Sequence, residues 1–273
     1  LRLTKLPDRT PGETVVMSGR YHIDRNTLYT QLTRNLKTPL TKAQQRSRRI
    51  GGNIIDSFLN QIAVRASTHN YRMLCLPTYI IALERDPTRV WDTLQSTTLK
   101  GIDLTSINTI LIPINLKLHW MLAHIDIDNK EIAIYDSHYN KLTQTEYSKK
   151  LCSLFAAAPG FKNTKWQTRK TADFPQQTNK YDSGLFTCAA ALCIGTNKSM
   201  IFSHKHMNNF RLALADSLLR DKTSTSHTTA LKSTSYKPFP TIPKPATITT
   251  PKTNKKPAAK HTTSPTTPTI SNK

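Results

Sequence analysis

Acidic residues, glycines and long apolar runs are all scarce in this chain of 273 residues. Asp and Glu number 17 against 39 Lys and Arg, which gives a formal net charge of +22. The eight glycines form no glycine-rich phosphate loop, which argues against a nucleotide site of that kind. The longest apolar run, residues 188–194, is far short of the roughly 20 residues that span a bilayer, so we expect no membrane-spanning helix.

The cysteines are few and widely spaced, without the close pairs of a zinc finger: Cys75, Cys152, Cys188 and Cys193. The first twenty residues lack the apolar run of a secretory signal. We therefore expect reduced cysteines in an intracellular protein of the nucleus or the cytoplasm. Two histidine pairs, His119 with His124 and His204 with His206, lack an acid or cysteine at metal-ligand spacing, so we expect no metal and no cofactor. The chain begins at Leu1 and not at Met, which favours a fragment or an excised product.

The last part of the chain, residues 222–273, differs in composition from the rest. It contains nine Lys, no Asp or Glu, and eight of the sixteen prolines, with many Ser and Thr. So little apolar surface cannot offset the conformational entropy lost on folding, and we expect this tail to be disordered. We divide the chain into an irregular or short-helical lead-in over residues 1–40, a folded domain over residues 41–221, and the tail.

Positive charge is not confined to the tail. Removing its nine charges from the total of +22 leaves +13 on residues 1–221, with Arg46, Arg48 and Arg49 as the densest cluster. Such a surface favours acidic partners, whether nucleic acid, anionic membrane or an acidic protein face. A solvated basic surface without any specific partner remains an alternative.

Apolar periodicity predicts the elements of the folded domain. A spacing of three to four predicts helices over residues 28–36, 53–66, 90–99, 142–158, 184–194 and 206–220. Gly195 would terminate the fifth of these helices. Dense β-branched and alternating residues predict strands over residues 109–115, 118–127 and 131–136, a short strand near 165–167, and one tight hairpin at Asp128-Asn129-Lys130. The pattern therefore predicts an α+β domain with a compact sheet.

Three side chains in this domain could carry chemistry, although each has an ordinary structural interpretation. His119 lies at the start of a predicted strand, where a lone histidine is most often structural. Asp136 closes a predicted strand, where carboxylates commonly cap turns. Ser183 precedes the apolar helix and, with Asp182, would make a common N-cap.

Taken together, the three residues supply a base, an orienting acid and a nucleophile position. A nucleophile at a helix N-terminus is placed where the macrodipole and free N–H groups stabilise negative charge. A histidine and an acid on adjacent strands can then align as base and orienter, as in nucleophilic hydrolases. Gln177, six residues before Ser183, can donate its side-chain amide to an oxyanion.

Four segments resemble motifs of the ubiquitin-like-protein-specific proteases, the SUMO or sentrin cysteine proteases. They are residues 112–120 (IPINLKLHW), 134–137 (IYDS), 174–188 (FPQQTNKYDSGLFTC) and 202–211 (FSHKHMNNFR). The third segment follows the family pattern P-Q-Q-x-N-x-x-D-C-G-x-F-x-C with serine in place of the nucleophilic cysteine. The resemblance covers residues 53–220 and implies a papain-like-related fold with a small mixed sheet flanked by helices.

The resemblance also implies roles and a partner. His119 would be the general base, Asp136 its orienter, and Gln177 would line the oxyanion hole, with Ser183 at the nucleophile position. Trp120 would roof a tunnel that admits the Gly-Gly tail of a SUMO-like or other ubiquitin-like modifier, after which the domain would cleave. Cys188 matches a helix cysteine of the family that is not the nucleophile.

Two departures from the family pattern bear on activity. Residues 49–53 replace most of a W-L-N-D-E segment that supplies a second tunnel tryptophan. Ser183 replaces the thiol, and we expect little turnover from a hydroxyl in a pocket sized for sulfur. Three interpretations explain the serine: an engineered trap, a natural inactive relative of the family, or a true serine protease. The altered segment over residues 49–53 favours the natural inactive relative.

Three hypotheses of function follow. The first is a SUMO-protease-type peptidase whose activity serine impairs. The second is a catalytically inactive pseudoprotease that binds a ubiquitin-like modifier. The third is a basic protein that contacts nucleic acid non-specifically through its surface and tail.

Overall fold

The computed structural model of this chain describes residues 13–18, 21–34, 39–67, 71–78, 80 and 86–220. Two predictions fall outside the described residues. They are the tail over residues 222–273 and the end of the helix predicted over residues 28–36. No helix in the described ranges is long and apolar enough to cross a membrane.

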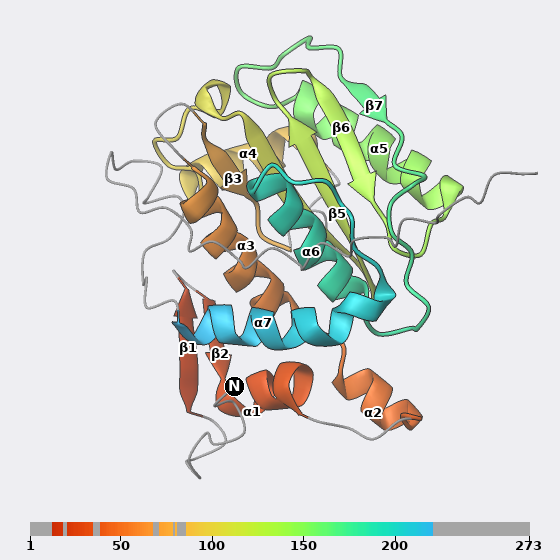
Figure 1. The fold of residues 1–273 in the computed structure, drawn as a ribbon. Coiled ribbons are helices and arrows are strands. Elements are labelled where there is room, and N and C mark those ends of the chain that lie inside the picture. The colour runs from red at the N-terminus through yellow and green to blue at the C-terminus, as the bar shows by residue number, and fades with distance from the viewer. Residues whose placement is uncertain are drawn as a thin grey trace, which may run out of the picture. The chain divides into compact units, whose positions relative to one another are not determined.

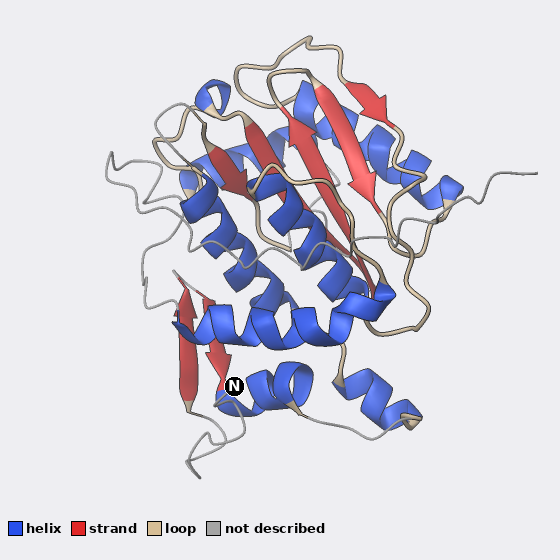
Figure 2. Ribbon diagram, in the orientation of Figure 1, coloured by secondary structure: helices blue, strands red, loops and turns tan. Residues whose placement is uncertain are grey.

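A five-stranded mixed sheet forms the centre of the domain (Figure 2). The strands lie in the order β3 (Met73–Cys75), β4 (Thr109–Leu116), β5 (His119–Asp126), β6 (Glu131–Tyr135) and β7 (Gln167–Arg169). The three central strands are antiparallel, whereas β3 and β7 pair in parallel with β4 and β6. The start of β5 and the end of β6 therefore lie at the same end of the sheet.

Helices cover both faces of this sheet (Figure 1). One face carries α3 (Gly52–Ala66) and α6 (Ser183–Gly195), and the other carries α4 (Pro87–Ser96) and α5 (Lys141–Ala156). Successive residues of β5 alternate between the two cores, since Leu122 packs with the α3 and α6 side and Met121 and Ala123 with the other. The period of two is that of a strand buried on both faces.

The helix α7 (Met207–Arg220) crosses the ends of α3 and α6 and contacts the N-terminal elements (Figure 1). These elements are β1 (Thr14–Ser18), β2 (Tyr21–Asp24), α1 (Arg25–Leu28), a π-helical turn (Tyr29–Thr33) and α2 (Lys42–Ser47). Two 3₁₀ turns, Leu104–Ser106 and His204–His206, complete the described elements. The arrangement places α2 and the start of α7 near the beginning of α6.

The predicted fold class is confirmed, and the helices predicted over residues 53–66, 90–99, 142–158, 184–194 and 206–220 are all present within three residues of their predicted ends. The short strand predicted near residues 165–167 is found at Gln167–Arg169. The helix predicted from residue 28 begins instead at Arg25 and changes to π geometry at Tyr29.

One local prediction was wrong, and two features of the sheet were not predicted. The lead-in is not irregular throughout, because β1 and β2 pair and bury Val16 and Ile23 against the domain core. A second tight hairpin joins β4 to β5 through Lys117 and Leu118, with Lys117 at φ 57° and no glycine or asparagine to mark the turn. The strand β3 was missed, since three residues are too short to show a period. The domain boundary at residue 40 stays a prediction.

Gly195 has a different role from the predicted one. It is the last residue of α6, its φ is not in the left-handed range, and Thr196 follows as the C-cap. A Cβ at this position would collide with the side chain of Ile62 on α3. The glycine therefore permits the close approach of α3 and α6 and does not act as a cap.

Candidate active site

His119 and Asp136 meet at one end of the sheet. His119 is the first residue of β5, and Asp136 directly follows β6. The Nε2 atom of His119 lies 2.6 Å from Oδ1 of Asp136, a short hydrogen-bonded contact. The carboxylate is 2% exposed and the imidazole 23%, so the acid is enclosed while the base keeps one side open.

Asp136 is itself held by its neighbours. Its Oδ1 accepts a hydrogen bond from the backbone N–H of His138 at 2.8 Å, and its carbonyl accepts one from Gln176 Nε2 at 3.0 Å. A fixed carboxylate on Nε2 favours the tautomer with the proton on that nitrogen. The other ring nitrogen, Nδ1, is then the acceptor available to a nucleophile.

Ser183 is placed beside this pair by a backbone contact. It is the first residue of α6 and is 3% exposed. Its Oγ accepts a hydrogen bond from the backbone N–H of Trp120 at 3.2 Å, so the hydroxyl lies next to the residue that follows His119. Within the described part of the chain, no hydrogen bond joins Ser183 Oγ to the imidazole.

Asp182 does not cap α6 as predicted. Its carboxylate instead accepts hydrogen bonds from Arg211 at 2.5 Å and from Asn179 Nδ2 at 2.7 Å. Arg211 lies on α7, is 1% exposed and also donates to the carbonyls of Gln31 and Arg48. Burial lowers the pKa of the Arg211 guanidinium, and the Asp182 carboxylate beside it opposes that effect.

The Asp182–Arg211 pair therefore ties the residue before the nucleophile to three other elements. The sequence reasoning missed this role for Arg211. Only its place in the 202–211 segment singled it out, and no local pattern joins residues that are 29 positions apart.

Gln177 is fixed next to the acid of the pair. Its Oε1 accepts a hydrogen bond from Ser137 Oγ at 2.7 Å, and its Nε2 donates to the carbonyl of Asn179 at 2.6 Å. Its backbone N–H donates to the Ser137 carbonyl at 2.8 Å. A side-chain amide has two N–H donors, so one remains for an oxyanion.

Trp120 is buried between residues 49–53, the segment that differs from the family pattern, and the start of α6. Its Nε1 donates to the carbonyl of Ile50 at 3.1 Å, and the indole is 8% exposed. A Cβ on Gly184 would lie 3.2 Å from the Trp120 ring and would collide with Ile50. Gly184 thus lets Ile50 and Trp120 pack directly beside Ser183, while the tunnel role of Trp120 stays a prediction.

Neither of the two buried cysteines, Cys75 and Cys188, is placed to replace a thiol at position 183. Cys188 lies in α6 and is fully buried, and burial raises the pKa of its thiol well above the usual range. Burial also raises the pKa of the Cys75 thiol, and its Sγ contacts the carbonyl of Leu59.

The described residues contain no group of three potential metal ligands.

Comparison with known proteins identifies the family. The model of the Ulp1 protease family, C-terminal catalytic domain, matches residues 86–223, just over half of the chain.

This chain belongs to the Ulp1 protease family.

Curated relatives of the family are sentrin-specific proteases. Sentrin-specific protease 5 of Homo sapiens is 31% identical over 122 residues, 41% of this chain and 15% of that protein. A sentrin-specific protease of Caenorhabditis elegans is 26% identical over 127 residues, 45% of this chain and 18% of that protein. The chain thus matches less than a fifth of the length of these relatives.

Solved structures of the Ulp1 family share the fold. The C-terminal Ulp1 protease domain in complex with Smt3, the yeast orthologue of SUMO, superposes with a TM-score of 0.63 at 20% identity, over 78% of this chain and 89% of that one. The Ulp1-like SUMO protease catalytic domain of Chaetomium thermophilum gives 0.61 at 20% identity, over 78% and 84%. The family and fold predicted from the sequence are confirmed.

Proposed function

We propose that this domain holds the C-terminal Gly-Gly of a ubiquitin-like, SUMO-type modifier at Ser183, and that serine impairs cleavage after it. The observation that carries the proposal is the 2.6 Å contact between His119 and Asp136 at the end of the sheet where Ser183 begins α6. A base, an acid and a helix-tip side chain are the components of acyl transfer. Family membership supplies the class of substrate.

The reaction that this geometry supports proceeds through an acyl-enzyme. A nucleophile at position 183 gives its proton to Nδ1 of His119 and attacks the carbonyl carbon of the terminal glycine. The C–N bond breaks, and the imidazolium returns the proton to the leaving amine. Water then hydrolyses the acyl-enzyme, and Gln177 with the N–H groups at the start of α6 stabilises the oxyanion.

Serine weakens the first step for a physical reason. A cysteine thiol beside histidine at a helix start falls from a pKa of about 8.5 to ~3–4 and rests as thiolate, whereas a hydroxyl does not ionise there. The Ser183 hydroxyl oxygen also accepts a hydrogen bond from the backbone N–H of Trp120. A misplacement of about 1 Å costs on the order of 100-fold in rate.

The second candidate is a pseudoprotease that binds the modifier without cleaving it. The serine at the start of α6 favours it, because a hydroxyl in that position does not ionise as a thiol does. Both candidates hold the modifier in the same way and differ only in turnover. Non-specific contact with nucleic acid stays a prediction.

A nucleophile swap tests the proposal. The Ser183→Cys variant should cleave a modifier precursor that extends beyond Gly-Gly at least about 100-fold faster than the native chain. Cleavage is followed on gels over hours, and Ser183→Cys with His119→Ala is the matched control that should lose it.

Binding tests what the two candidates share, and turnover by the native chain separates them. Calorimetry of the native chain with mature modifier should show saturable heat under either one. If the native chain binds nothing and Ser183→Cys cleaves nothing, the proposal fails. Equal rates for the native chain and Ser183→Cys would contradict impairment by serine.

A further inference from the structure

Positive side chains are frequent on the segments that contact the start of α6 and the loop before it. They come from the end of the π-helical turn, from α2 and the two residues after it, from the loop before α6, and from the 3₁₀ turn before α7. We call them the basic rim: Arg34, Lys42, Arg46, Arg48, Arg49, Lys180 and Lys205.

Contacts place these segments beside Ser183. Arg49 Nε donates to the carbonyl of Lys180 at 3.2 Å, three residues before the nucleophile position. Arg48 donates to Asn208 on α7 at 3.3 Å and to the carbonyl of Arg34 at 3.2 Å. These bonds join the separate segments into one surface.

Two further contacts bring the rim to the nucleophile. Ile50, the residue after Arg49, packs where a side chain on Gly184 would stand. His204, the residue before Lys205, lies 3.8 Å from the Asp182 carboxylate.

The segments that carry the basic rim contain no exposed carboxylate that would offset its positive charge. Among the described residues 29–34, 41–53, 176–182 and 199–211, Asp182 is the one carboxylate. It is 3% exposed and paired with Arg211, so a partner in solution does not meet its charge. Five rim residues, Arg34, Lys42, Arg46, Lys180 and Lys205, are exposed.

The other end of the sheet has a different character. A cavity of about 590 Å³ there is lined by Asp126, Asp128 and Asp173 together with Arg169 and Lys170. Both signs of charge mix at that end. The surface beside Ser183 therefore has positive charge without an exposed acid, whereas the lining of this cavity does not.

We propose that the basic rim recognises acidic side chains of the modifier next to its Gly-Gly tail, so that this chain selects modifiers by charge. The inference rests on the proposed function, because the occupant is the molecule whose tail reaches Ser183. Exposed charges of one sign attract an oppositely charged face, speed its association and exclude like-charged partners. The attraction weakens as salt screens it.

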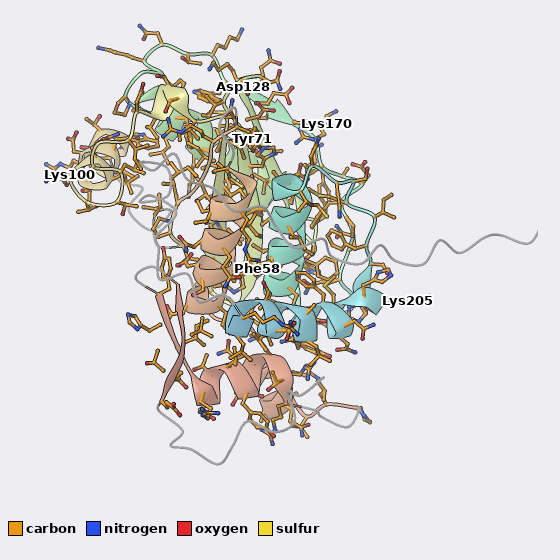
Figure 3. All side chains as sticks on the ribbon, turned by 60° about the vertical axis from the view of Figure 1, so that its left-hand side comes forward. Phe58, Tyr71, Lys100, Asp128, Lys170 and Lys205 are labelled. Atoms are coloured by element: carbon orange, nitrogen blue, oxygen red, sulfur yellow. The ribbon has the colours of Figure 1, made fainter. Side chains whose placement is uncertain are left out.

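A charge-reversal pair tests the rim. Arg46→Glu with Lys205→Glu changes two exposed side chains that make no hydrogen bond or ion pair within the described part of the chain. Lys100→Glu with Lys162→Glu is the control, because both residues are exposed and the change in net charge is the same. Lys100 and Lys205 lie on opposite sides of the view in Figure 3.

The probe is mature yeast SUMO, titrated by calorimetry at several salt concentrations. The rim variant should bind it at least about 10-fold more weakly than the native chain near 0.1 M salt, with a smaller dependence of Kd on salt. The control variant should stay within about twofold of the native chain. Melting curves check that both variants fold, and Arg49→Gln replaces the rim variant if it does not.

The outcomes separate this inference from the proposed function. If the native chain binds SUMO and the rim variant binds as tightly as the control, the inference is overturned and the proposed function stands. If the rim variant loses affinity only for a DNA duplex measured in parallel, the rim serves nucleic acid and the inference is overturned. If neither SUMO binding nor cleavage by Ser183→Cys occurs, both fail together.

Discussion

At the scale of single residues, one atom separates this chain from the usual chemistry of its family. His119, Asp136 and Gln177 have partners that suit base, orienter and oxyanion donor. Ser183 has the right place, at the start of α6, but an oxygen where the family has sulfur. Under the proposed function, the site would hold the components of acyl transfer except for an ionisable nucleophile.

His124 is a second residue whose environment is unusual. It lies on β5 and lines the cavity at the far end of the sheet from His119, together with Tyr71, Asp128 and Lys170. The labels of these three residues mark that region in Figure 3. Both ring nitrogens are buried and have no hydrogen-bond partner among the described residues. Burial, reinforced by the Arg169 guanidinium and opposed by Asp126, lowers the pKa of His124 to about 4.

This shift predicts a loss of stability in mild acid. Because the folded pKa of about 4 lies below the usual histidine pKa of 6.5, the unfolded chain binds the proton first as pH falls between these values. The free energy of unfolding should decrease across that window, by up to about 3 kcal/mol from this residue. Urea unfolding of the native chain at pH 7, 5.5 and 4.5 measures it.

The matched variant is His124→Leu. It should show a flatter pH dependence over the same window, because it removes the titrating ring. An unchanged slope in His124→Leu would assign the acid sensitivity to other groups.

At the scale of elements, the buried Asp182–Arg211 pair holds the nucleophile end of α6 in place. It joins the loop before α6 to α7, and Arg211 extends the connection to the π-helical turn and to α2. A carboxylate left alone in such a site is strongly destabilising, since its desolvation is no longer compensated. The pair is thus structural, and it fixes the residue directly before Ser183.

Arg211→Met should lower the free energy of unfolding by about 3–5 kcal/mol, because it leaves Asp182 buried without its partner. Arg220→Met on the same helix is the control. Arg220 is 78% exposed and pairs with Asp216 at 2.8 Å, so its loss should cost under about 1 kcal/mol. Similar unfolding midpoints in urea for the two variants would show that the buried pair does not hold this end of α6.

At the scale of the whole molecule, charge is the dominant property. The formal total is +22, of which residues 1–221 carry +13. The remaining nine positive charges belong to residues 222–273, which lie outside the described residues. Their composition predicts a charged extension that adds nothing to the core.

Deletion of residues 222–273 should leave the melting temperature of the domain within about 2 °C, because this segment has few apolar residues to bury. It should also weaken retention on a heparin column, since nine positive charges are removed. Thermal scans and a salt gradient measure the two effects. A large drop in melting temperature would mean that the segment packs against the domain.

The sequence alone predicted most of the elements, the fold class and the family. Apolar spacing is local information, so α3, α5, α6 and α7 could be predicted within a few residues, as could the alternating strands β5 and β6. The candidate site residues could be named in the same way. They fall inside motifs, and their spacing to the start of a helix or the end of a strand can be read along the chain.

Only the tertiary structure decided which side chains touch. The sequence did not show that Asp182 would pair with Arg211 and not cap α6, that Ser183 would bond to the Trp120 amide, or that Gly195 would face Ile62. These contacts join positions far apart in the chain. Their energies depend on burial and on the packing of whole elements, and neither of these is encoded in any short stretch of residues.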